Sequence, residues 1–289
     1  MVIRTEGPAR TCGVPEGHTI HRLARDHRRK LTGGPLVVSS PQGRAADAAA
    51  VLDGGVLRDV DAFGKHLLYR FVTTEGDQRT LHVHLGLFGR FRPRRVPPPQ
   101  PRGQLRLRIV GARHAADLSG PTACALIDFA EEDALLARLG PDPLRADADP
   151  TRFLAALARR RISIAQALMD QSVIAGVGNV YRAEALHAER IDPYLPAREL
   201  GEERAAALWA RIAEQLANGV EDNRIVTAPG ARDQPVRVRR NEAVCVYRRS
   251  ACWTCGGAIS SDKLAGRVLW WCPACQPPAV TAPSSSATR

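Results

Sequence analysis

The spacing of hydrophobic residues changes along the chain. From Thr19 to Leu31 apolar residues recur at helical spacing, and Gly33-Gly34 ends the run, so a helix is predicted there. Short apolar runs typical of β-strands follow, punctuated by glycine and proline, at 36–38, 56–57, 66–71, 81–84 and 105–109. In the last run the arginines alternate onto one face. This pattern predicts a β-sandwich or barrel for the N-terminal half.

The second half has a helical pattern. Around Gly140-Pro141-Asp142-Pro143 the character of the chain changes, and residues 151–220 are rich in alanine and leucine at helical spacing. Two helices, over 162–171 and from about 180 to 188, flank a glycine-containing turn. Residues 92–102 read as a proline-rich basic loop between strands, and 224–249 as an arginine-dense irregular segment. The order of strands and then helices predicts an α+β fold.

The length, charge and composition of the chain limit the kinds of partner that it is expected to bind. The 289 residues suffice for two domains, each with its own core. A net charge of +11 favours nucleic acid or an anionic membrane as the partner, although arginine-rich chains also arise from GC-rich codon usage. No apolar run approaches the roughly 18 residues of a transmembrane helix. Residues 1–13 lack the apolar core of a secretory signal, so a cytosolic protein without a membrane partner is expected.

Four of the seven cysteines form a metal-binding pattern. Cys252 and Cys255 are separated by two residues, as are Cys272 and Cys275, and 16 residues lie between the pairs. Two such turns bring four thiolates into a tetrahedron around one structural Zn²⁺, with no open position for catalysis. A pair of redox disulfides is the main alternative, which the hairpin separation disfavours. The other three cysteines, Cys12, Cys124 and Cys245, match no such spacing.

The turn between the two helices is a candidate phosphate site. Gly176 and Gly178 allow close approach of a partner to the backbone, and Asn179 falls at or near the N-cap of the second helix. Exposed N–H groups and the positive end of the helix dipole suit a phosphate there. The alternative is an ordinary helical hairpin with an asparagine cap.

Pro15 is a candidate nucleophile under one condition. Inside a chain it is a tertiary amide without a reactive lone pair, whereas at a free N-terminus it is a secondary amine able to form an iminium. Fourteen residues precede it in the sequence. The chemistry available to the protein therefore depends on where the mature chain begins.

Together these residues resemble the formamidopyrimidine-DNA glycosylase and endonuclease VIII family of base-excision repair enzymes. The matching motifs run in order from residue 14 to 276, and six in succession are highly specific. They are Pro15-Glu16-Gly17, Gly64-Lys65-His66, the segment His84–Gly89, the segment Leu139–Leu144, the helix–two-turn–helix signature from Gln171 through Gly178-Asn179, and the zinc finger with Arg267 on its hairpin.

The resemblance implies an N-terminal β-sandwich domain and a C-terminal helix–two-turn–helix domain ending in a four-cysteine zinc finger, with DNA in the cleft. We accordingly expect a catalytic domain over 14–135, a helical DNA-binding domain over 136–240 and a zinc finger over 241–277. Residues 1–13 are expected to be a non-native or disordered extension, and 278–289 a disordered tail. A bacterial, cytoplasmic, nucleoid-associated monomer follows from the same resemblance.

The resemblance also implies the chemistry. The Pro15 amine attacks C1′ of a damaged nucleotide flipped out of the duplex, which releases the base and leaves an iminium. Glu16 assists as a general acid during opening of the sugar ring, and β- and δ-elimination then nick the strand. If Pro15 opens a helix, the helix dipole disfavours protonation of its amine.

The implied DNA contacts involve six residues. Lys65, Asn179 and Arg267 match positions that grip the phosphate beside the lesion; outside the family, Lys65 and Arg267 would be ordinary surface residues. Leu87-Phe88 resembles the apolar wedge of the endonuclease VIII branch, which fills the gap left by the flipped base. His82 and His84 share a strand face, but no third ligand is near in sequence, so His84 is expected to line the site and a second metal is not expected.

Two departures bear on the substrate. Thr19 stands where the family commonly has a second glutamate, and the residues 117–122 do not match the arginine and phenylalanine that guanine-lesion members insert into the stack. With the Leu87-Phe88 wedge, this favours oxidised pyrimidines over 8-oxoguanine. Single-stranded and bubble substrates stay open.

The segment before Pro15 leaves a rival interpretation. Val14 occupies the position of the family's initiator methionine, and GUG valine codons also initiate translation in bacteria, so translation is expected to start at codon 14. If residues 1–14 are retained, the protein is a non-catalytic or proteolytically activated DNA-binding relative. A zinc-ribbon nucleic-acid adaptor is a third option. Glu16 and Lys65 argue against both alternatives, because neither needs those residues in these places.

Overall fold

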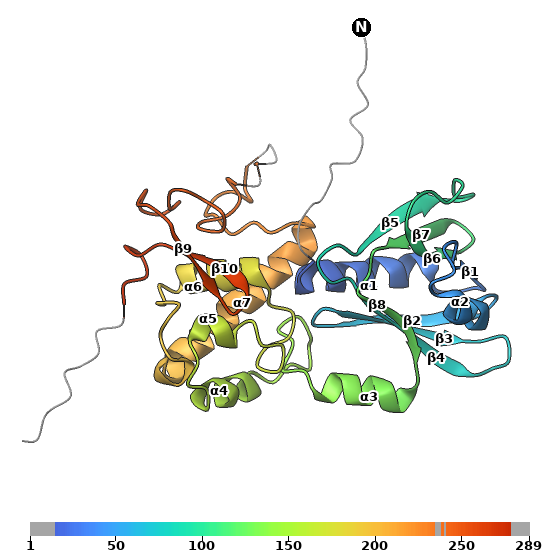
Figure 1. The fold of residues 1–289 in the computed structure, drawn as a ribbon, viewed down its shortest axis with the longest axis horizontal. Helices are drawn as coiled ribbons and strands as arrows, with labels where there is room; N and C mark the ends of the chain where they lie inside the picture. The colour runs from blue at the N-terminus through green and yellow to red at the C-terminus, as the bar shows by residue number, and fades with distance from the viewer. Residues whose placement is uncertain (1–14, 235–237, 240, 279–289) are drawn as a thin grey trace, which may run out of the picture.

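The protein has a sheet-rich half and a helix-rich half, which lie next to one another in space (Figure 1). The structure is a computed structural model that describes residues 15–234, 238–239 and 241–278. The expected extension over 1–13 and residues 279–289 of the expected tail lie outside the described residues. Within the described part of the chain, no helix is both long and apolar enough to cross a membrane.

The sheet-rich half is the expected β-sandwich. It contains α1 (Gly17–Leu31), β1 (Val37–Ser39), α2 (Ala46–Leu52), β2 (Val56–Phe63), β3 (His66–Val72), β4 (Gln78–His84), β5 (Arg90–Arg95), β6 (Leu105–Val110), β7 (His114–Ser119) and β8 (Ala123–Ile127). The strands form two antiparallel four-stranded sheets, in the orders β1-β6-β7-β5 and β2-β3-β4-β8. The prediction from the short, punctuated strand patterns is confirmed.

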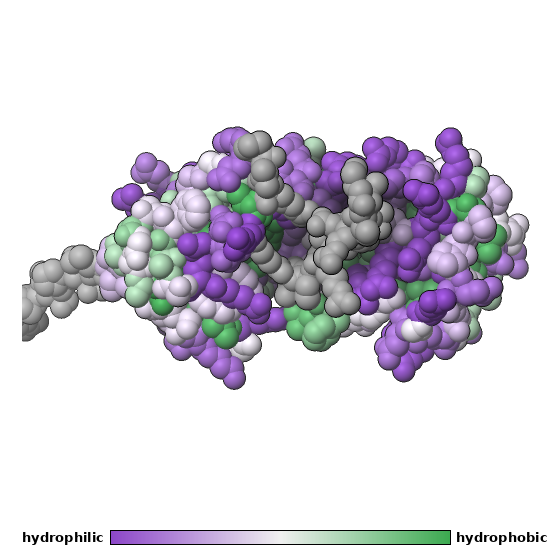
Figure 2. Space-filling view, turned by 90° about the horizontal axis from the view of Figure 1, so that it is seen from above, coloured by the Kyte–Doolittle hydropathy of each residue, from purple (hydrophilic) through white to green (hydrophobic). Residues whose placement is uncertain are grey.

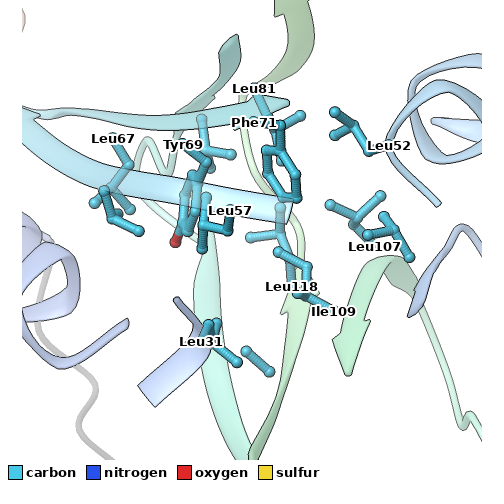
Figure 3. Packing of buried hydrophobic residues seen from close by; sticks show 14 of the residues in the cluster. Leu31, Leu52, Leu57, Leu67, Tyr69, Phe71, Leu81, Leu107, Ile109 and Leu118 are labelled. Atoms are coloured by element: carbon cyan, nitrogen blue, oxygen red, sulfur yellow. The ribbon is translucent and has the colours of Figure 1, made fainter. Parts of the chain in front are cut away.

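The core lies between the two sheets (Figure 3). Alternate residues Leu67, Tyr69 and Phe71 of β3 are buried there, together with Leu107 and Leu118 from the opposite sheet. This period of two is what a strand requires if one of its faces packs against another layer. The outer face of β3 and β4 is partly covered by α3 (Phe129–Ala137), whose Glu132 accepts hydrogen bonds from both strands.

The prediction of a loop over 92–102 is wrong at its start. Strand β5 continues to Arg95 and pairs with β7 along its whole length. It is an edge strand, where Pro93 is tolerated because no further strand needs its missing N–H. Its Arg94 binds the buried carboxylate of Asp117, which also binds Arg108 at 2.7 Å. A carboxylate distant in the sequence therefore pairs with one of the arginines that made this region look like a loop.

The helix-rich half follows α3. It contains α4 (Pro150–Ala158), α5 (Ile164–Ala167), α6 (Asn179–Ala188), the short 3-10 turn η1 (Ala197–Glu199), α7 (Glu202–Asp222) and the hairpin β9 (Ser260–Leu264) and β10 (Arg267–Trp271). The helix predicted over 162–171 is a single turn with a capping box at Ser163, and turns follow it. Leu269 of β10 packs into the core formed by the helices, so the hairpin and helices share one hydrophobic cluster.

The two halves meet at a junction that contains glycines and the buried carboxylate of Asp142. The Gly17 N–H donates to the Gly176 carbonyl at 2.8 Å, and a Cβ on Gly64 would lie 2.9 Å from the Ala175 Cβ. Asp142, 1% exposed, accepts hydrogen bonds from the Gly64 N–H and the His21 ring, both at 2.7 Å. These contacts place the start of α1 and the β2–β3 turn directly on the turn before α6.

Candidate active site

Glu16 joins the start of the sandwich to the start of α6. Its side chain is completely buried, and its carboxylate accepts hydrogen bonds from the N–H groups of Gly178 at 3.0 Å, Val180 at 2.9 Å and Tyr181 at 3.4 Å. Burial raises the pKa of Glu16, against the lowering effects of Lys65 and of these backbone donors. The arrangement holds a carboxyl group with a raised pKa at a fixed place beside Pro15.

This contact revises the expected phosphate site. Asn179 is the first residue of α6 and Gly178 is its N-cap, without a side-chain cap. The free N–H groups of the helix N-terminus therefore serve the protein's own Glu16 rather than standing open to a phosphate. The glycine at 178 is required by this contact, because a Cβ there would overlap the Glu16 carboxyl carbon.

Pro15 stands just outside the first helix. Glu16 is the N-cap of α1 and the helix begins at Gly17, so Pro15 does not itself open the helix as the dipole argument supposed. It is half-buried and precedes the anchored Glu16 directly. Its position is therefore set by the hydrogen bonds of its neighbour and by the Gly17–Gly176 contact.

Lys65 reaches the same turn from the sandwich. It lies between β2 and β3, and its Nζ donates to the Val177 carbonyl at 2.5 Å, an oxygen that also accepts from Gln171 at 3.0 Å. Burial lowers the pKa of Lys65 to about 8, with Glu16 opposing this effect and Arg267 adding to it. The lysine is thus aimed at the junction and holds its proton at neutral pH.

Asn179 links the helical half to the hairpin. Its side-chain amide donates to the Val268 carbonyl at 2.9 Å, and its carbonyl accepts a hydrogen bond from Arg182. Val268 follows Arg267, which is exposed at the start of β10. Through Val177, Asn179 and Val268 the three predicted phosphate-binding residues, Lys65, Asn179 and Arg267, come together.

The expected wedge is displayed on a tight turn. Leu87 is 42% exposed and Phe88 is 84% exposed, at the tip of the connection between β4 and β5. The turn is held by a hydrogen bond from the Gly89 N–H to the buried Leu85, and by one from the Thr122 N–H to His84. The face seen from above shows hydrophilic residues over much of both halves, with apolar patches between them (Figure 2). Two large apolar side chains presented together in this way suit insertion into a base stack.

His84 has two histidine neighbours. His66 on β3 is the register partner of His84. The Nδ1 atom of His66 also shares a hydrogen bond of 2.8 Å with Nε2 of His82. Burial lowers the pKa of His66 to about 3 and that of His82 to about 4, so both are neutral at pH 7. Strand pairing thus brings the His66 ring beside the two histidines that share a face of β4.

The four cysteines of the hairpin converge. Within the described ranges, the group of potential ligands that converges closely enough to hold a metal is Cys252, Cys255, Cys272 and Cys275. All four sulfur atoms lie within 4.8 Å of one another, with Sγ–Sγ distances of 3.9 Å and 3.5 Å for two of the pairs. Tetrahedral ligation with metal–sulfur bonds of about 2.3 Å requires a separation of about 3.8 Å. The residues present therefore fit a four-thiolate metal ion.

Two residues of the site were missed from the sequence. Asp142 was noticed only as part of a Gly-Pro-Asp-Pro motif, although the flanking prolines were a signal for a fixed turn. Arg182 gave no signal, because it sits in a helix whose residues are buried on nearly every side. Both roles depend on contacts between distant segments.

Comparisons with known proteins cover most of the chain. Residues 14–119 match the formamidopyrimidine-DNA glycosylase N-terminal domain, and residues 139–229 match the formamidopyrimidine-DNA glycosylase H2TH domain. Endonuclease 8 1 of Mycobacterium tuberculosis is 46% identical over 271 residues, which cover 91% of this chain and 100% of that protein. Formamidopyrimidine-DNA glycosylase of Laribacter hongkongensis is 33% identical over 278 residues, covering 91% and 98%.

A solved structure has the same fold. The complex between the Lactococcus lactis Fpg and DNA containing an abasic site superposes with a TM-score of 0.75 at 22% identity, and covers 91% of this chain and 99% of that one. At this level of identity the likeness establishes the architecture of the two halves.

Proposed function

The chain belongs to the formamidopyrimidine-DNA glycosylase family, whose members are DNA glycosylases with AP lyase activity in base-excision repair, and we propose that it removes oxidised pyrimidines through an iminium at Pro15. The observation that carries this proposal is the anchoring of Glu16 at the start of α6, with Lys65 beside it. This contact holds the segment that bears Pro15 against the surface where Asn179 and Arg267 meet. We further propose that it acts as a cytoplasmic, nucleoid-associated monomer on damaged DNA, with its domains over 14–135, 136–240 and 241–277.

The proposed reaction begins at the Pro15 nitrogen. With a free amine, its lone pair attacks C1′ as the damaged base leaves with the electron pair of its bond to C1′, and loss of the amine proton leaves C1′ bonded to both the Pro15 nitrogen and the ring oxygen. The Glu16 carboxyl, whose pKa is raised by burial, gives a proton to the ring oxygen as the bond from C1′ to that oxygen breaks, and the Pro15 nitrogen lone pair then forms the iminium. Loss of a C2′ proton then expels the 3′ phosphate, and a second elimination expels the 5′ phosphate.

Three donors hold the strand during these steps. Lys65 supplies a charge, Asn179 an amide N–H and Arg267 a guanidinium to the phosphate beside the lesion. His84 lines the site in its neutral form, because burial and Lys65 lower its pKa. Lys65 is fixed by a contact that crosses the junction, and Asn179 by its contact with Val268 beside Arg267, so binding and chemistry share one frame.

The preference for pyrimidines is supported by the connection between β7 and β8. The two strands are joined by Gly120–Thr122 alone, and Asp117 is buried in contact with arginines. This short turn offers no long side chain to the space opposite an extruded purine, whereas Leu87 and Phe88 stand exposed nearby. Single-turnover excision from thymine-glycol and 8-oxoguanine duplexes should be faster for thymine glycol. Faster excision of the purine lesion would overturn this preference.

Replacing the wedge should impair duplex substrates selectively. Leu87→Ala with Phe88→Ala should lower kcat/KM on a lesion in duplex DNA by about tenfold to a hundredfold, because the cost of extruding a base is a few kcal/mol and the wedge offsets part of it. The same lesion in a single strand should change by less than about threefold. Phe129→Ala is the matched control, since Phe129 is 79% exposed on α3 and lies outside the site. Equal losses on both substrates would contradict the wedge role.

We propose that the four cysteines hold one structural Zn²⁺, which would stabilise the hairpin that carries Arg267. The support is the convergence of their sulfur atoms, together with the N–H of Gly257 and the His187 ring, which approach Cys255 and Cys252 at 3.4 Å and 3.3 Å.

Removing the metal should disconnect the hairpin from DNA. Chelation, or Cys272→Ser, should abolish the stoichiometric zinc and weaken affinity for abasic-site DNA at least about tenfold, because small metal modules fold on their metal. The fluorescence of Trp253, Trp270 and Trp271 should report the change. Cys124→Ser is the control, because this free cysteine lies on β8 outside the cluster. Full affinity after complete loss of zinc would contradict the proposed role.

A further inference from the structure

Arg182 is the largest completely buried side chain of the described residues, and its charge is unusually placed. It is 0% exposed on α6. One terminal nitrogen of its guanidinium donates to the Asn179 carbonyl and, at 3.3 Å, to the Val268 carbonyl, while Nε and the other terminal nitrogen have no hydrogen-bond partner. No described carboxylate forms an ion pair with it. A buried cation of this kind is costly, so its retention calls for a specific role.

The guanidinium dictates the orientation of the Asn179 amide. Arginine only donates hydrogen bonds, so the Asn179 carbonyl oxygen must face it and the amide nitrogen must point away. That nitrogen gives one N–H to Val268 at 2.9 Å and keeps its second N–H for another acceptor. Because the donor is charged, it also polarises the amide and makes that remaining N–H a stronger donor.

The same guanidinium ties the helix to the hairpin. Val268 directly follows Arg267, so the Arg182 contact with the Val268 carbonyl fixes the backbone from which Arg267 projects. Burial lowers the pKa of Arg182 to about 10, with Glu16 opposing and Arg267 adding to the effect, so the side chain is protonated at neutral pH. It supplies a fixed positive charge between two predicted phosphate ligands.

We propose that Arg182 is a positioning residue for phosphate binding: sealed from DNA itself, it sets the Asn179 amide in the orientation that donates to the strand. This inference rests on the proposed contact of Asn179 with the phosphate. It differs from a general structural role because it requires that Arg182 act through Asn179. It also differs from direct phosphate binding, because the side chain has no exposed surface.

A double-mutant cycle on the full chain tests this coupling. The variants are Arg182→Met, Asn179→Ala and the combination, and the measurement is the Kd for a duplex with a tetrahydrofuran abasic-site analogue, which is not cleaved. Each single variant should raise the Kd about tenfold, and the combination no more than either alone, because both remove one shared interaction. Arg211→Met is the control: its guanidinium pairs with Glu189 and Glu214 on the helical surface, and it loses the same charge.

A second measurement separates the rival roles. The slope of log Kd against log salt should stay unchanged in Arg182→Met, whereas a side chain that touched a phosphate would lower it by about 0.9. If Arg182→Met loses zinc or unfolds, Arg182→Lys replaces it in the cycle, because lysine keeps the charge but its shorter side chain ends before the position of the terminal guanidinium nitrogen that contacts both carbonyls.

The outcomes are distinguishable. Additive losses, or a reduced salt slope, would overturn the positioning role. If Arg182→Met has a normal Kd and Asn179→Ala has a raised Kd, the positioning role of Arg182 is wrong, whereas the proposed contact of Asn179 with the phosphate is retained. A normal Kd for Asn179→Ala would overturn the proposed contact of Asn179, and this inference with it.

Discussion

Glu16→Gln should lower the kcat of abasic-site cleavage by about 10²- to 10⁴-fold, the range that a positioned general acid contributes. Glutamine keeps the volume and one acceptor oxygen, but it has no proton to give and turns an N–H₂ group toward the donors of α6. Because burial raises the pKa of the carboxyl, the wild-type kcat should fall as pH rises through that value, and the variant should lose this limb. Stopped-flow cleavage across pH measures both effects.

A second buried carboxylate provides the control for Glu16. Glu132 is 6% exposed and accepts hydrogen bonds from Arg70 and Thr80 on the outer face of the sandwich, away from the junction. Glu132→Gln should reduce stability with little effect on kcat. Gly178→Ala should behave like Glu16→Gln instead, since its Cβ would displace an intact carboxyl group. A Glu16→Gln enzyme with normal kcat and an unaltered pH profile would exclude the acid role.

Lys65→Met should raise the KM for abasic-site DNA by about tenfold to a hundredfold and reduce the salt slope of binding by about 0.9, because one charged phosphate contact is lost. In the wild type, affinity should fall as pH rises through about 8, where Lys65 loses its proton in the folded protein. The measurement is Kd at pH 7 and pH 9 for both proteins. Lys30→Met, in the last turn of α1, is the matched control.

Linkage gives the pH test of Lys65 an internal check. The pKa of Lys65 falls from its ordinary 10.5 to about 8 on folding, so between these values the unfolded chain holds the proton and the folded chain does not. The contribution of Lys65 to stability therefore rises with pH in this window, while affinity for DNA falls. Weaker binding at pH 9 then cannot be attributed to unfolding caused by this residue. Affinity of the wild type that stays constant from pH 7 to 9 would contradict the phosphate role.

The architecture was predictable where the sequence carries a local period. The alternation over 66–71 and the spacing of the four cysteines specify a half-buried strand and a metal-binding turn without reference to distant residues. Strand β5 was missed because Asp117, which neutralises its Arg94, lies 23 residues away in the chain. Its proline and arginines, taken locally, are the composition of a loop.

The sequence allowed the residues of the site to be predicted, but not most of the hydrogen bonds that connect them. Pro15, Glu16, Lys65, Asn179 and Arg267 were named from motifs. The structure places Lys65 and Asn179 at the turn before α6, with Arg267 next to the Val268 that Asn179 contacts. That Glu16 occupies the helix N-terminus could not be anticipated, because its donors lie 162 to 165 residues away. The sequence alone does not show that the N–H groups of a helix N-terminus are bonded when their acceptor is remote in the chain. The role of Arg182 could not be predicted for the same reason.

Borohydride trapping on an abasic-site oligonucleotide tests the central claim most directly, because borohydride reduces an iminium to a stable protein–DNA crosslink. Two forms are compared: the 289-residue chain and a chain that begins at Pro15 with a free amine. We expect a crosslink from the form that begins at Pro15, mapped to Pro15 by mass spectrometry and absent when the proline amine is blocked, and none from a form that retains the preceding residues. Binding of the abasic-site DNA without a crosslink from the free-amine form, or an equal crosslink from both forms, would contradict catalysis by Pro15.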